Sequence, residues 1–431
     1  MSDYLFLLDN HLDAGQNRAV AGIQRLATAA GMNVWLTGGA MRDMLRGAPI
    51  RDLDFTVERD AVTTGRALAA EIGGTVLAED PLHRWVELLL PDGITASVSN
   101  ARTEKYAKPG ATPEISPATI HADLSRRDFT INAIALSLGR GSRGLLVDPA
   151  NGQADLLSRE LRTCSSFAFL DDPARIYRLF RFQHVLGFTL HPRTQSQLEN
   201  ALLEEYQSAA ASWVLGKELR TAVREGQAAA MLAGLDSHGL LKVLSGALTG
   251  SKLNPAGLEK LGKLAQSVLP SGFEGGWLAF VHVLTEKLTA RDRAEVVRNL
   301  EFTPDELAAA KKLDSQVGKL EESLKVTTRP SQVWEALHLA TADEVLLVLY
   351  GSQVRVVQDR IRAYYEKYLP LAQEVTDDEV VAAGGKPGTA KFDKVRRSLI
   401  ISRLNARPRK IEIVEPEPVQ VAAAVVGRGR R

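Results

Sequence analysis

The sequence has very little cysteine, almost no net charge and no long apolar run. Cys164 is the single cysteine among 431 residues, which excludes an internal disulfide and fits a reducing compartment. No uncharged apolar stretch approaches the roughly 18 residues that a membrane-spanning helix needs. The first residues, MSDYLFLLDN, lack the basic start of a secretory signal. We therefore expect a soluble, cytoplasmic protein with no membrane partner.

The charges nearly cancel, because 53 Lys and Arg face 52 Asp and Glu and give a formal net charge of +1. Global basicity therefore does not point to nucleic acid, and any such partner must be bound by a local patch. Hydrophobic residues make up 45% of the chain, which is enough for two to four domains with cores.

Strand and helix patterns alternate in the first third of the chain. Apolar runs at 33–39, 52–58, 84–90 and 145–152 predict strands, and residues 17–31 predict a helix that ends near Gly31. Residues 105–120 contain three prolines and predict an extended loop rather than an element of the fold. From Asp172 onward nearly every pattern is helical. The fold class predicted is α+β, with a mixed head followed by an all-helical remainder.

Two carboxylates, Asp52 and Asp54, alternate along the strand predicted at 52–58. Alternate side chains share one face of a strand, so these two repel each other unless a cation lies between them. Oxygen ligands of this kind suit Mg²⁺. Upstream, Gly38 and Gly39 form a turn without β-carbons that lets backbone N–H groups approach phosphate, and Arg42 can bind the same anion. Taken alone, the Asp-x-Asp pattern is also that of a solvated structural face.

Five ordered segments resemble the bacterial tRNA nucleotidyltransferase and poly(A) polymerase family, the class II CCA-adding enzymes. The first is GGAMRDMLRG followed by RDLDF, and the second is DLSRRDFTINAIAL. The third is DPANGQADLLSRELR, the fourth is DDPARIYRLFRFQHVLGF, and a tail segment is GGKPGTAKFDKVRRSLIISRL. The resemblance covers residues 20–190 closely and extends more loosely to about residue 410.

The resemblance implies roles for individual residues. Asp52 and Asp54 would be catalytic and bind the metal ions, which would activate the 3′-hydroxyl of an RNA primer. Arg127, Asp128 and Asn132 would bind the ribose and triphosphate, and Arg178 would contact the nucleotide. If 128–132 is helical, Asp128 and Asn132 are neighbours on one face. The alternative for this segment is a helix cap at Asp128 or Thr130 with merely solvated basic residues.

Asp172 and Arg175 lie three residues apart at a predicted helix start, which Pro173 also favours. Arginine can donate to cytosine O2 and N3 or to adenine N1, and a carboxylate can accept from either base's amino group. Uracil and guanine present the reverse pattern. The resemblance implies that this pair selects the nucleobase without a template; simple capping by Asp172 is the alternative.

The sequence departs from the family pattern at some positions. The family commonly has an acidic residue near Ser97, so if a third carboxylate helps to hold metal, this sequence lacks it there and Glu104 is a weak substitute candidate. The segment before Glu218 lacks the family's usual Glu-Arg. Asp148, Gly152 and Asp155 are as consistent with a structural junction as with catalysis. No His-Asp pair of phosphohydrolase type occurs in the second half, so an appended phosphohydrolase domain is not expected.

A basic run occupies residues 391–410, where eight Lys and Arg accompany one acid, Asp393. Lys391, Lys394, Arg396 and Arg397 are candidates for contacts with RNA phosphates, which position RNA without reading its bases. The alternative is an ordinary solvated helix face.

Four regions are predicted. They are a nucleotidyltransferase head at 1–165, a helical base-selecting neck at 166–235, an RNA-binding body and tail at 236–410, and a disordered tail at 411–431. The implied activity is template-independent addition of C and A to the tRNA 3′ end, using CTP, ATP and Mg²⁺. C-only addition, A-only addition and polyadenylation remain alternatives, and loop 105–120 is a candidate for nucleotide switching. A catalytically inactive RNA-binding protein is an alternative of another class.

Overall fold

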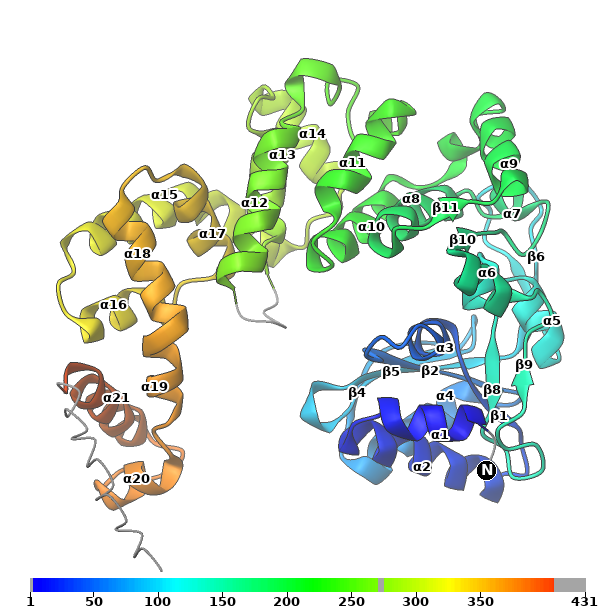
Figure 1. Ribbon diagram of the computed structural model, residues 1–431, viewed down its shortest axis with the longest axis horizontal. Helices are drawn as coiled ribbons and strands as arrows, with labels where there is room; N and C mark the ends of the chain where they lie inside the picture. The colour runs from blue at the N-terminus through cyan, green and yellow to red at the C-terminus, as the bar shows by residue number, and fades with distance from the viewer. Residues whose placement is uncertain (1–2, 270–274, 407–431) are drawn as a thin grey trace, which may run out of the picture. The chain divides into compact units, whose positions relative to one another are not determined.

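The computed structural model describes residues 3–269 and 275–406, which fall into two compact units (Figure 1). The first comprises Met1–Gly318 and Thr341–Gly351, and the second comprises Lys319–Ala340 and Ser352–Arg431. The four regions predicted above were defined from sequence patterns rather than from contacts within the structure, and they remain predictions. The disordered tail predicted at 411–431 lies outside the described residues.

The first unit is built on a seven-stranded mixed sheet with the order β3-β4-β5-β2-β1-β8-β9. The strands are β1 Val34–Thr37, β2 Asp52–Val57, β3 Thr75–Asp80, β4 Trp85–Leu89, β5 Thr95–Asn100, β8 Ala135–Ser137 and β9 Leu146–Val147. Strands β2 and β5 run parallel, whereas the other neighbours in the sheet are antiparallel. All four strands predicted from apolar runs are confirmed.

Helices α1 (Asp3–His11), α2 (Ala14–Ala29) and α4 (Ala61–Ile72) lie along one side of the sheet (Figure 1). Asp13 and Gln16 form a capping box at the start of α2, and Gly31 follows its end with a positive φ of 60°, as predicted. Between these helices and the sheet lies a core that includes Ile23, Phe55 and Leu68. This core fixes which face of β2 points away from it.

Shorter elements complete the head. They are α3 (Gly38–Leu45), β6 (Arg102–Lys105), β7 (Glu114–Pro117), α5 (Ile120–Ser125), a 3₁₀ turn at Thr130–Asn132, α6 (Gly152–Ser158) and β10 (Glu160–Leu161), which pairs in parallel with β11 (Thr189–Leu190). Two further 3₁₀ turns are Pro91–Gly93 in the sheet region and Tyr206–Ala209 beyond it.

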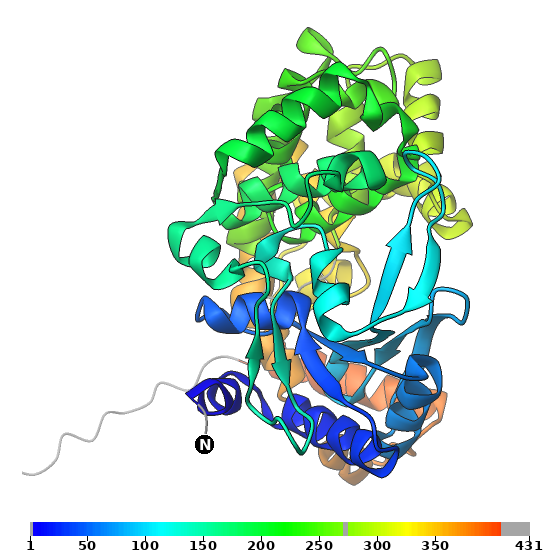
Figure 2. The ribbon, with the colours of Figure 1, turned by 90° about the vertical axis from the view of Figure 1, so that its right-hand side faces the viewer.

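The extended loop predicted at 105–120 is wrong in part, because β6 and β7 pair as an antiparallel hairpin (Figures 1 and 2). The prolines are compatible with this pairing, since Pro113 lies outside β7 and Pro117 is its last residue, where a missing N–H is tolerated. Residues 106–113 form the connection between the two strands.

After the head, the first unit is helical apart from β11. Its helices are α7 Ala168–Asp171, α8 Ala174–Leu186, α9 Pro192–Leu203, α10 Ser212–Arg224, α11 Ala228–Ser237, α12 Pro255–Val268, α13 Trp277–Thr285, α14 Ala290–Asn299 and α17 Ala342–Gly351, with 3₁₀ turns at Leu240–Val243 and Gly250–Lys252. The helix predicted after Asp172 is confirmed, because the Asp172 carboxylate accepts from Ala174 N at 3.1 Å and Gly187 ends α8 with a φ of 63°.

The second unit is helical as well. Helix α15 (Pro304–Val326) includes the boundary between the units, and the others are α16 Pro330–Leu337, α18 Arg355–Ala363, a π-helical turn at Tyr364–Tyr368, α19 Leu369–Gln373, α20 Asp377–Ala382 and α21 Ala390–Asn405. The fold class is therefore α+β, as predicted. Across residues 3–269 and 275–406, no helix has both the length and the apolar character needed to span a bilayer.

Candidate active site

Asp52 and Asp54 lie on one face of β2, and Leu53 and Phe55 point to the other. Both apolar side chains are fully buried, whereas Asp52 is exposed and Asp54 is half-buried. The alternation predicted from the sequence is therefore confirmed. It follows from the pleat of a strand whose opposite face is packed against the core.

Strand β5 places a hydroxyl group beside each of these carboxylates. The parallel register pairs Asp52 with Thr95 and Asp54 with Ser97. Thr95 donates a hydrogen bond to Asp52, and Ser97 Oγ donates to Asp54 Oδ1 at 2.7 Å. Ser97, near which the resemblance leads one to expect an acidic residue, is thus a hydrogen-bond donor to Asp54.

The two glycines between β1 and α3 bring backbone against Asp54. Gly38 has a φ of +63°, and a β-carbon there would lie only 2.9 Å from Asp54 Oδ2. Gly39 N donates to the same oxygen at 3.2 Å. The turn therefore needs glycine for its backbone conformation and for its close approach to the carboxylate.

Burial raises the pKa of Asp54 above its ordinary value, and the nearby Asp52 adds to this shift. Hydrogen bonds from Ser97 and Gly39 and the charge of Arg127 act in the opposite direction. A cation placed between the two carboxylates would favour the ionised form of both.

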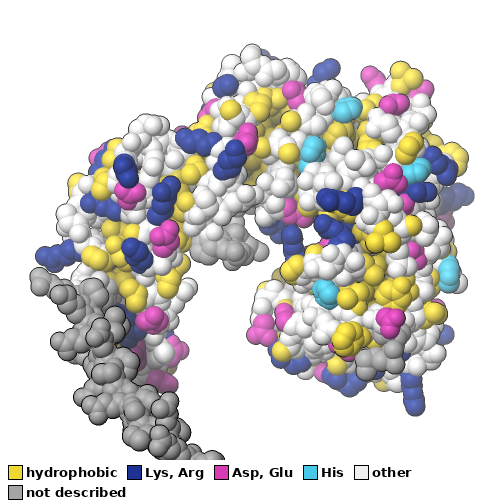
Figure 3. Space-filling model, viewed as in Figure 1, with side chains coloured by type: hydrophobic (Ala, Val, Ile, Leu, Met, Phe, Trp, Pro, Cys, Tyr) yellow, Lys and Arg dark blue, Asp and Glu magenta, His cyan; other side chains and the backbone are white. Residues whose placement is uncertain are grey.

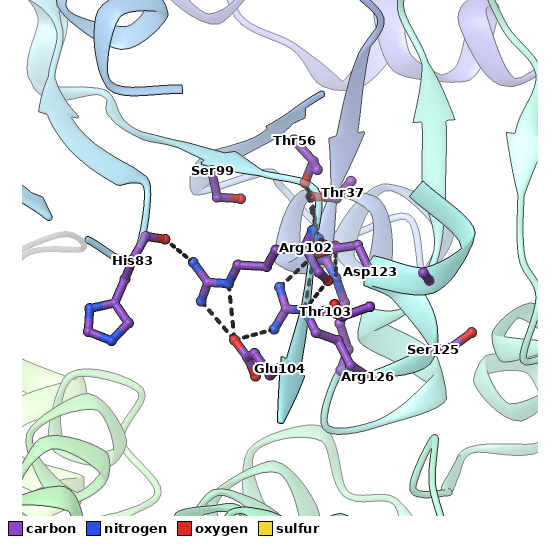
Figure 4. Close-up of polar contacts among 12 residues, drawn as sticks. Thr37, Thr56, His83, Ser99, Arg102, Thr103, Glu104, Asp123, Ser125 and Arg126 are labelled. Carbon is purple, nitrogen blue, oxygen red and sulfur yellow. Dashed lines mark hydrogen bonds and ion pairs between the residues drawn. The ribbon is translucent and has the colours of Figure 1, made fainter. Parts of the chain in front are cut away.

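Arg127 is held beside the glycine turn by a buried carboxylate. Its guanidinium donates to Asp123 Oδ2 at 2.9 and 3.1 Å and to the Thr56 hydroxyl at 3.1 Å. Arg126 binds the other oxygen of Asp123 at 2.5 Å and also binds Glu104 at 2.7 Å. Figure 4 shows this chain of ion pairs leading from α5 to the β6 strand.

Glu104 is engaged by two arginines and a tyrosine. Arg102 lies 2.9 Å from its carboxylate, and Arg126, which directly follows α5, lies 2.7 Å from it (Figure 4). The Tyr106 hydroxyl donates to the same carboxylate at 2.9 Å. These cations hold the pKa of Glu104 below its ordinary value although its burial acts to raise it. In the described part of the chain, no group of three or more His, Cys, Asp or Glu side chains has a geometry suited to a metal ion.

The condition that 128–132 is helical is not met, because Asp128 precedes the short 3₁₀ turn Thr130–Asn132. Phe129 is extended and forms a β-bridge with Thr163, which interrupts helical geometry. Nevertheless the two side chains meet, since Asn132 Nδ2 donates to Asp128 Oδ1 at 3.2 Å. Asn132 Oδ1 in turn accepts from Arg42 at 2.9 Å.

Asp172 and Arg175 lie together at the start of α8, with Arg175 Nε 3.5 Å from Asp172 Oδ2. Arg175 is buried and also donates to the Arg126 carbonyl at 2.8 Å, so its guanidinium is fixed from two sides. One turn further along α8, Arg178 binds Asp128 at 3.0 Å and Glu218 of α10 at 3.3 Å. The pair predicted to select the base is thus preformed.

A single cavity of about 610 Å³ brings the predicted residues together. Its lining includes every catalytic and nucleotide-binding candidate from the sequence: Gly38, Gly39, Arg42, Asp52, Asp54, Arg127, Asp128, Asn132, Asp172, Arg175 and Arg178. The whole lining belongs to the first compact unit.

Several lining residues were not predicted, among them Arg102, Tyr106, Arg181, Phe182 and Glu225. Arg181 binds Glu218 at 2.6 Å and Glu225 at 3.2 Å, and its guanidinium carbon lies 4.3 Å from the centre of the Phe182 ring. The position of Arg181 and Phe182 within the fourth sequence segment was a signal that could have identified them. Glu225 carried none, because its approach to the cavity depends on tertiary packing.

The acids of the third segment lie outside this cavity. Asp148 accepts from the backbone N–H groups of Gly152 and Gln153 at 2.7 and 2.9 Å, which caps α6. Asp155 binds Arg162 at 2.9 Å and the Thr130 hydroxyl at 2.5 Å. These contacts are structural.

In the second unit, the basic candidates for RNA contact lie on α21. Arg397 pairs with Glu335 at 2.6 Å, and Arg396 pairs with Asp377. Lys391 and Lys394 are exposed and have no ion pair to a described residue. The remaining bases at 407–410 lie outside the described residues. The face shown in Figure 3 carries basic and acidic side chains interspersed.

The head thus combines a mixed sheet, two alternate aspartates on β2 and a diglycine turn beside them. Residues 34–162 match the family model described as the poly A polymerase head domain. This match over the head agrees with the resemblance drawn from the ordered motifs.

Individual relatives carry more specific names. The chain is 38% identical over 211 residues to the A-adding tRNA nucleotidyltransferase of Halalkalibacterium halodurans, covering 47% of this chain and 49% of that one. It is 25% identical to the A-adding enzyme of Geobacter sulfurreducens, covering 94% and 47%. A CC-adding enzyme of the same organism is 37% identical over 175 residues, covering 40% of this chain and 36% of that one. The chain spans about half the length of the first relatives or less.

Solved structures share the fold over nearly the whole chain. A CCA-adding enzyme in its apo form II has a TM-score of 0.59 at 23% identity and covers 95% of this chain and 96% of its own. The Thermotoga maritima CCA-adding enzyme complexed with tRNA has a TM-score of 0.56 at 22% identity and covers 94% and 95%.

Proposed function

We propose that this protein is a nucleotidyltransferase that adds C and A to the 3′ end of tRNA from CTP and ATP. The observation that carries the proposal is the single cavity that holds paired carboxylates, a glycine turn and the Asp172–Arg175 pair. The named activities of the relatives, which add A or CC to tRNA, support the same reaction class.

Asp52 and Asp54 would hold Mg²⁺, and the donor set fits that ion. Both supply carboxylate oxygens from one face of β2, and no Lys or Arg among the described residues lies within ion-pair distance of the half-buried Asp54. Bound there, Mg²⁺ would neutralise charge on the triphosphate and acidify the RNA 3′-hydroxyl. Ser97 and Thr95 fix the orientation of the two carboxylates through their hydrogen bonds.

The triphosphate would lie against the glycine turn. Gly39 N is already aimed at an anionic oxygen, that of Asp54, and Arg42 and Arg127 supply guanidinium groups to the same cavity. Asp43 holds Arg42 at 2.9 Å, and Asp123 holds Arg127 at 2.9 Å, so both cations are positioned in advance. Positioning of this kind is the main contribution a protein makes to phosphoryl-type transfer.

Arg175 and Asp172 would read the Watson–Crick edge of the incoming base. Arginine donors match the acceptors of C and A, and the carboxylate accepts from the amino group that both bases carry. Arg175→Ala is expected to reduce discrimination against UTP and GTP about 10–100-fold, on the scale of 1–3 kcal/mol for one lost hydrogen-bonded contact. Incorporation of each of the four nucleotides at several concentrations measures this, and unchanged selectivity contradicts the role.

The specificity proposed is the complete CCA triplet. A second candidate, addition of the terminal A alone, is favoured by the A-adding names of the first relatives, one of which is matched over 94% of this chain. The cytoplasm is the compartment proposed for either activity, and contacts from Lys391 and Lys394 to tRNA phosphates are proposed for both.

The test uses three tRNA transcripts that end before CCA, after C and after CC. Each is incubated with Mg²⁺ and CTP, ATP or both, and products are resolved at single-nucleotide length. Growth of the first transcript to CCA and no further supports the complete activity. Addition to the CC-ended transcript alone indicates an enzyme that adds only the terminal A. Arrest at CC indicates a CC-adding enzyme, and a long A tail indicates polyadenylation. If none of the three transcripts is extended, the proposed reaction is overturned.

A further inference from the structure

A second cavity, of about 520 Å³, shares no lining residue with the candidate active site. It is formed where the ends of α3 and α6 meet the residues after α8. Its lining residues are Leu45, Arg46, Gln153, Leu156, Leu157, Arg159 and Phe188. No carboxylate is among them, so the charged groups that line this cavity are all cationic.

Both arginines converge on one aromatic ring. The guanidinium carbon of Arg46 lies 5.5 Å from the centre of the Phe188 ring, and that of Arg159 lies 5.9 Å from it. Each contact is a favourable cation–π interaction by itself. Together they hold two like charges at one wall of a cavity that lacks an acid.

The polar side chains of the lining have hydrogen-bond donors that the described residues do not engage. The Arg159 guanidinium makes no ion pair or hydrogen bond with any residue that the structure describes. Arg46 has one carboxylate nearby, Asp43 at 3.8 Å, which already accepts from Arg42 at 2.9 and 3.0 Å. Gln153 accepts from a tyrosine hydroxyl through Oε1 at 2.9 Å, which leaves its amide nitrogen as a further donor.

The two arginines are the C-terminal caps of α3 and α6, and a cation at a helix C-terminus is stabilised by the helix dipole. That position explains one charge on each helix. It does not explain why both side chains are directed to the same ring. Burial lowers the pKa of Arg46, and the charges of Arg42, Arg159 and Arg51 lower it further against the opposing effect of Asp43. Arg159 also occupies the left-handed region, with a φ of 58°, which is uncommon for a residue other than glycine.

We propose that this cavity binds a phosphate group through Arg46, Arg159 and the amide of Gln153. Guanidinium groups bind phosphate oxygens with paired donors, and an anion between these two arginines removes their mutual repulsion. Free inorganic phosphate and a phosphodiester of bound RNA present the same oxygens, so either is a source of the group. This site is independent of the nucleotidyl-transfer reaction proposed above.

The first arm of the test counts phosphate bound per chain by equilibrium dialysis with radiolabelled inorganic phosphate. Arg159→Gln and the double variant Arg46→Gln/Arg159→Gln are expected to bind one phosphate fewer than the unmodified protein, and Arg159→Lys is expected to retain part of the binding. Arg143→Gln is the matched control, since Arg143 is an exposed arginine between β8 and β9 without an ion pair to a described residue.

The second arm measures the affinity of a tRNA transcript over a range of salt concentrations. If RNA supplies the phosphate, the slope of log affinity against log salt falls by about 0.7–0.9 for each lost phosphate contact. If the variant binds one phosphate fewer but the salt slope of tRNA binding is unchanged, the site is assigned to a free anion. Equal phosphate counts and equal slopes for Arg159→Gln and Arg143→Gln, in variants with unchanged circular dichroism, overturn the proposal. If Arg159→Gln fails to fold, Arg46→Gln takes its place in both arms.

Nucleotide incorporation at saturating RNA separates the two proposals. Neither Arg46 nor Arg159 lines the candidate active site, so Arg159→Gln is expected to keep the incorporation rate of the unmodified protein. An inactive protein that still loses one bound phosphate in this variant would contradict the proposed function and leave the phosphate site intact.

Discussion

Asp52 and Asp54 share a face of β2 but occupy different surroundings. Asp52 is exposed and accepts from one hydroxyl, whereas Asp54 is half-buried and accepts from Ser97 Oγ and Gly39 N. Burial therefore makes Asp54 the more constrained of the two carboxylates. Loss of its charge would also change the contacts of the glycine turn.

For Asp54→Asn we expect nucleotide incorporation to fall by about 10³-fold, the scale for removing a group that stabilises charge in a transition state. The RNA affinity is expected to change less than twofold, because Asp54 lines the cavity, whereas the residues proposed to contact RNA phosphates are on α21. Single-turnover incorporation and fluorescence anisotropy with labelled tRNA measure the two quantities. Activity near that of the unmodified protein would contradict the assignment of Asp54 to the proposed metal site.

Ser97 is predicted to act by orienting Asp54. Ser97→Ala removes the 2.7 Å hydrogen bond and is expected to weaken Mn²⁺ binding and incorporation about 10–100-fold, the usual effect of deleting a partner that orients a metal ligand. Electron paramagnetic resonance of bound Mn²⁺ measures the affinity directly.

Ser99 is a matched control on the same strand and face. Its hydroxyl lies 3.5 Å from the Phe55 carbonyl and does not contact either aspartate. Ser99→Ala is expected to bind Mn²⁺ normally. Equal Mn²⁺ affinities for Ser97→Ala and Ser99→Ala would show that the contact to Asp54 has no orienting role.

At the scale of elements, Asp123 joins α5 to strand β6 and to the site. Its carboxylate is buried and binds Arg126 and Arg127, and it accepts from Arg102 N at 3.3 Å. Burial acts to raise the pKa of Asp123, but Arg127 and Arg126 outweigh it and hold this pKa below its ordinary value. A carboxyl whose pKa is lower in the folded state stabilises the fold above its unfolded pKa and loses that effect as pH falls.

For Asp123→Asn we expect the free energy of unfolding to fall by about 3–5 kcal/mol near neutral pH, the cost of leaving buried cations without their partner. The difference from the unmodified protein is expected to shrink as pH falls below the ordinary Asp pKa of about 4, because the unfolded chain takes up this proton before the folded state, whose Asp123 pKa is lower. Urea unfolding at both pH values measures this.

Asp92→Asn serves as the comparison, because Asp92 pairs with Arg18 at the surface with both side chains more than half exposed. Its loss is expected to cost less than about 1 kcal/mol at either pH. A pH-independent difference for Asp123→Asn would contradict the ionised state assigned to the buried carboxyl.

Elements were predictable where local pattern and tertiary packing agree. The alternation in Asp52–Phe55 is local, and the core behind β2 enforces it, so the strand and its polar face were both predicted. The helical geometry considered for Asp128–Asn132 is absent because Phe129 pairs with Thr163. Strand β7 was missed for a similar reason, since it exists only by pairing with β6.

At the scale of the whole molecule, part of the positive charge in the basic run at 391–410 is neutralised by acidic residues from elsewhere in the chain. Glu335 and Asp377 come from other helices of the same unit and pair with Arg397 and Arg396. Charge counted along a segment therefore overestimates the charge that the segment presents. Lys391 and Lys394 are the exposed cations of α21 that such pairs leave available.

We expect the double variant Lys391→Gln/Lys394→Gln to weaken tRNA binding and to reduce the salt slope by about 1–2, which corresponds to one or two lost phosphate contacts. Affinities measured at several salt concentrations test this. Lys311→Gln/Lys312→Gln on α15 is the control, since both residues are exposed and lack ion pairs to described residues. Identical slopes for the two double variants would leave α21 without a role in RNA binding.

The cavity lining begins at Thr37 and ends at Glu225, whose carboxylate lies 3.7 Å from Arg51, next to Asp52. A ribosome adds about 5–20 residues per second, so the strand carrying the aspartates is made roughly 10–30 s before the far end of α10. During that interval the nascent head has its acidic face but lacks the helical wall that carries Arg175, Arg181 and Glu218. Under the proposed function, choice among nucleotides is thus acquired late in synthesis, after the groups that bind metal have already been made.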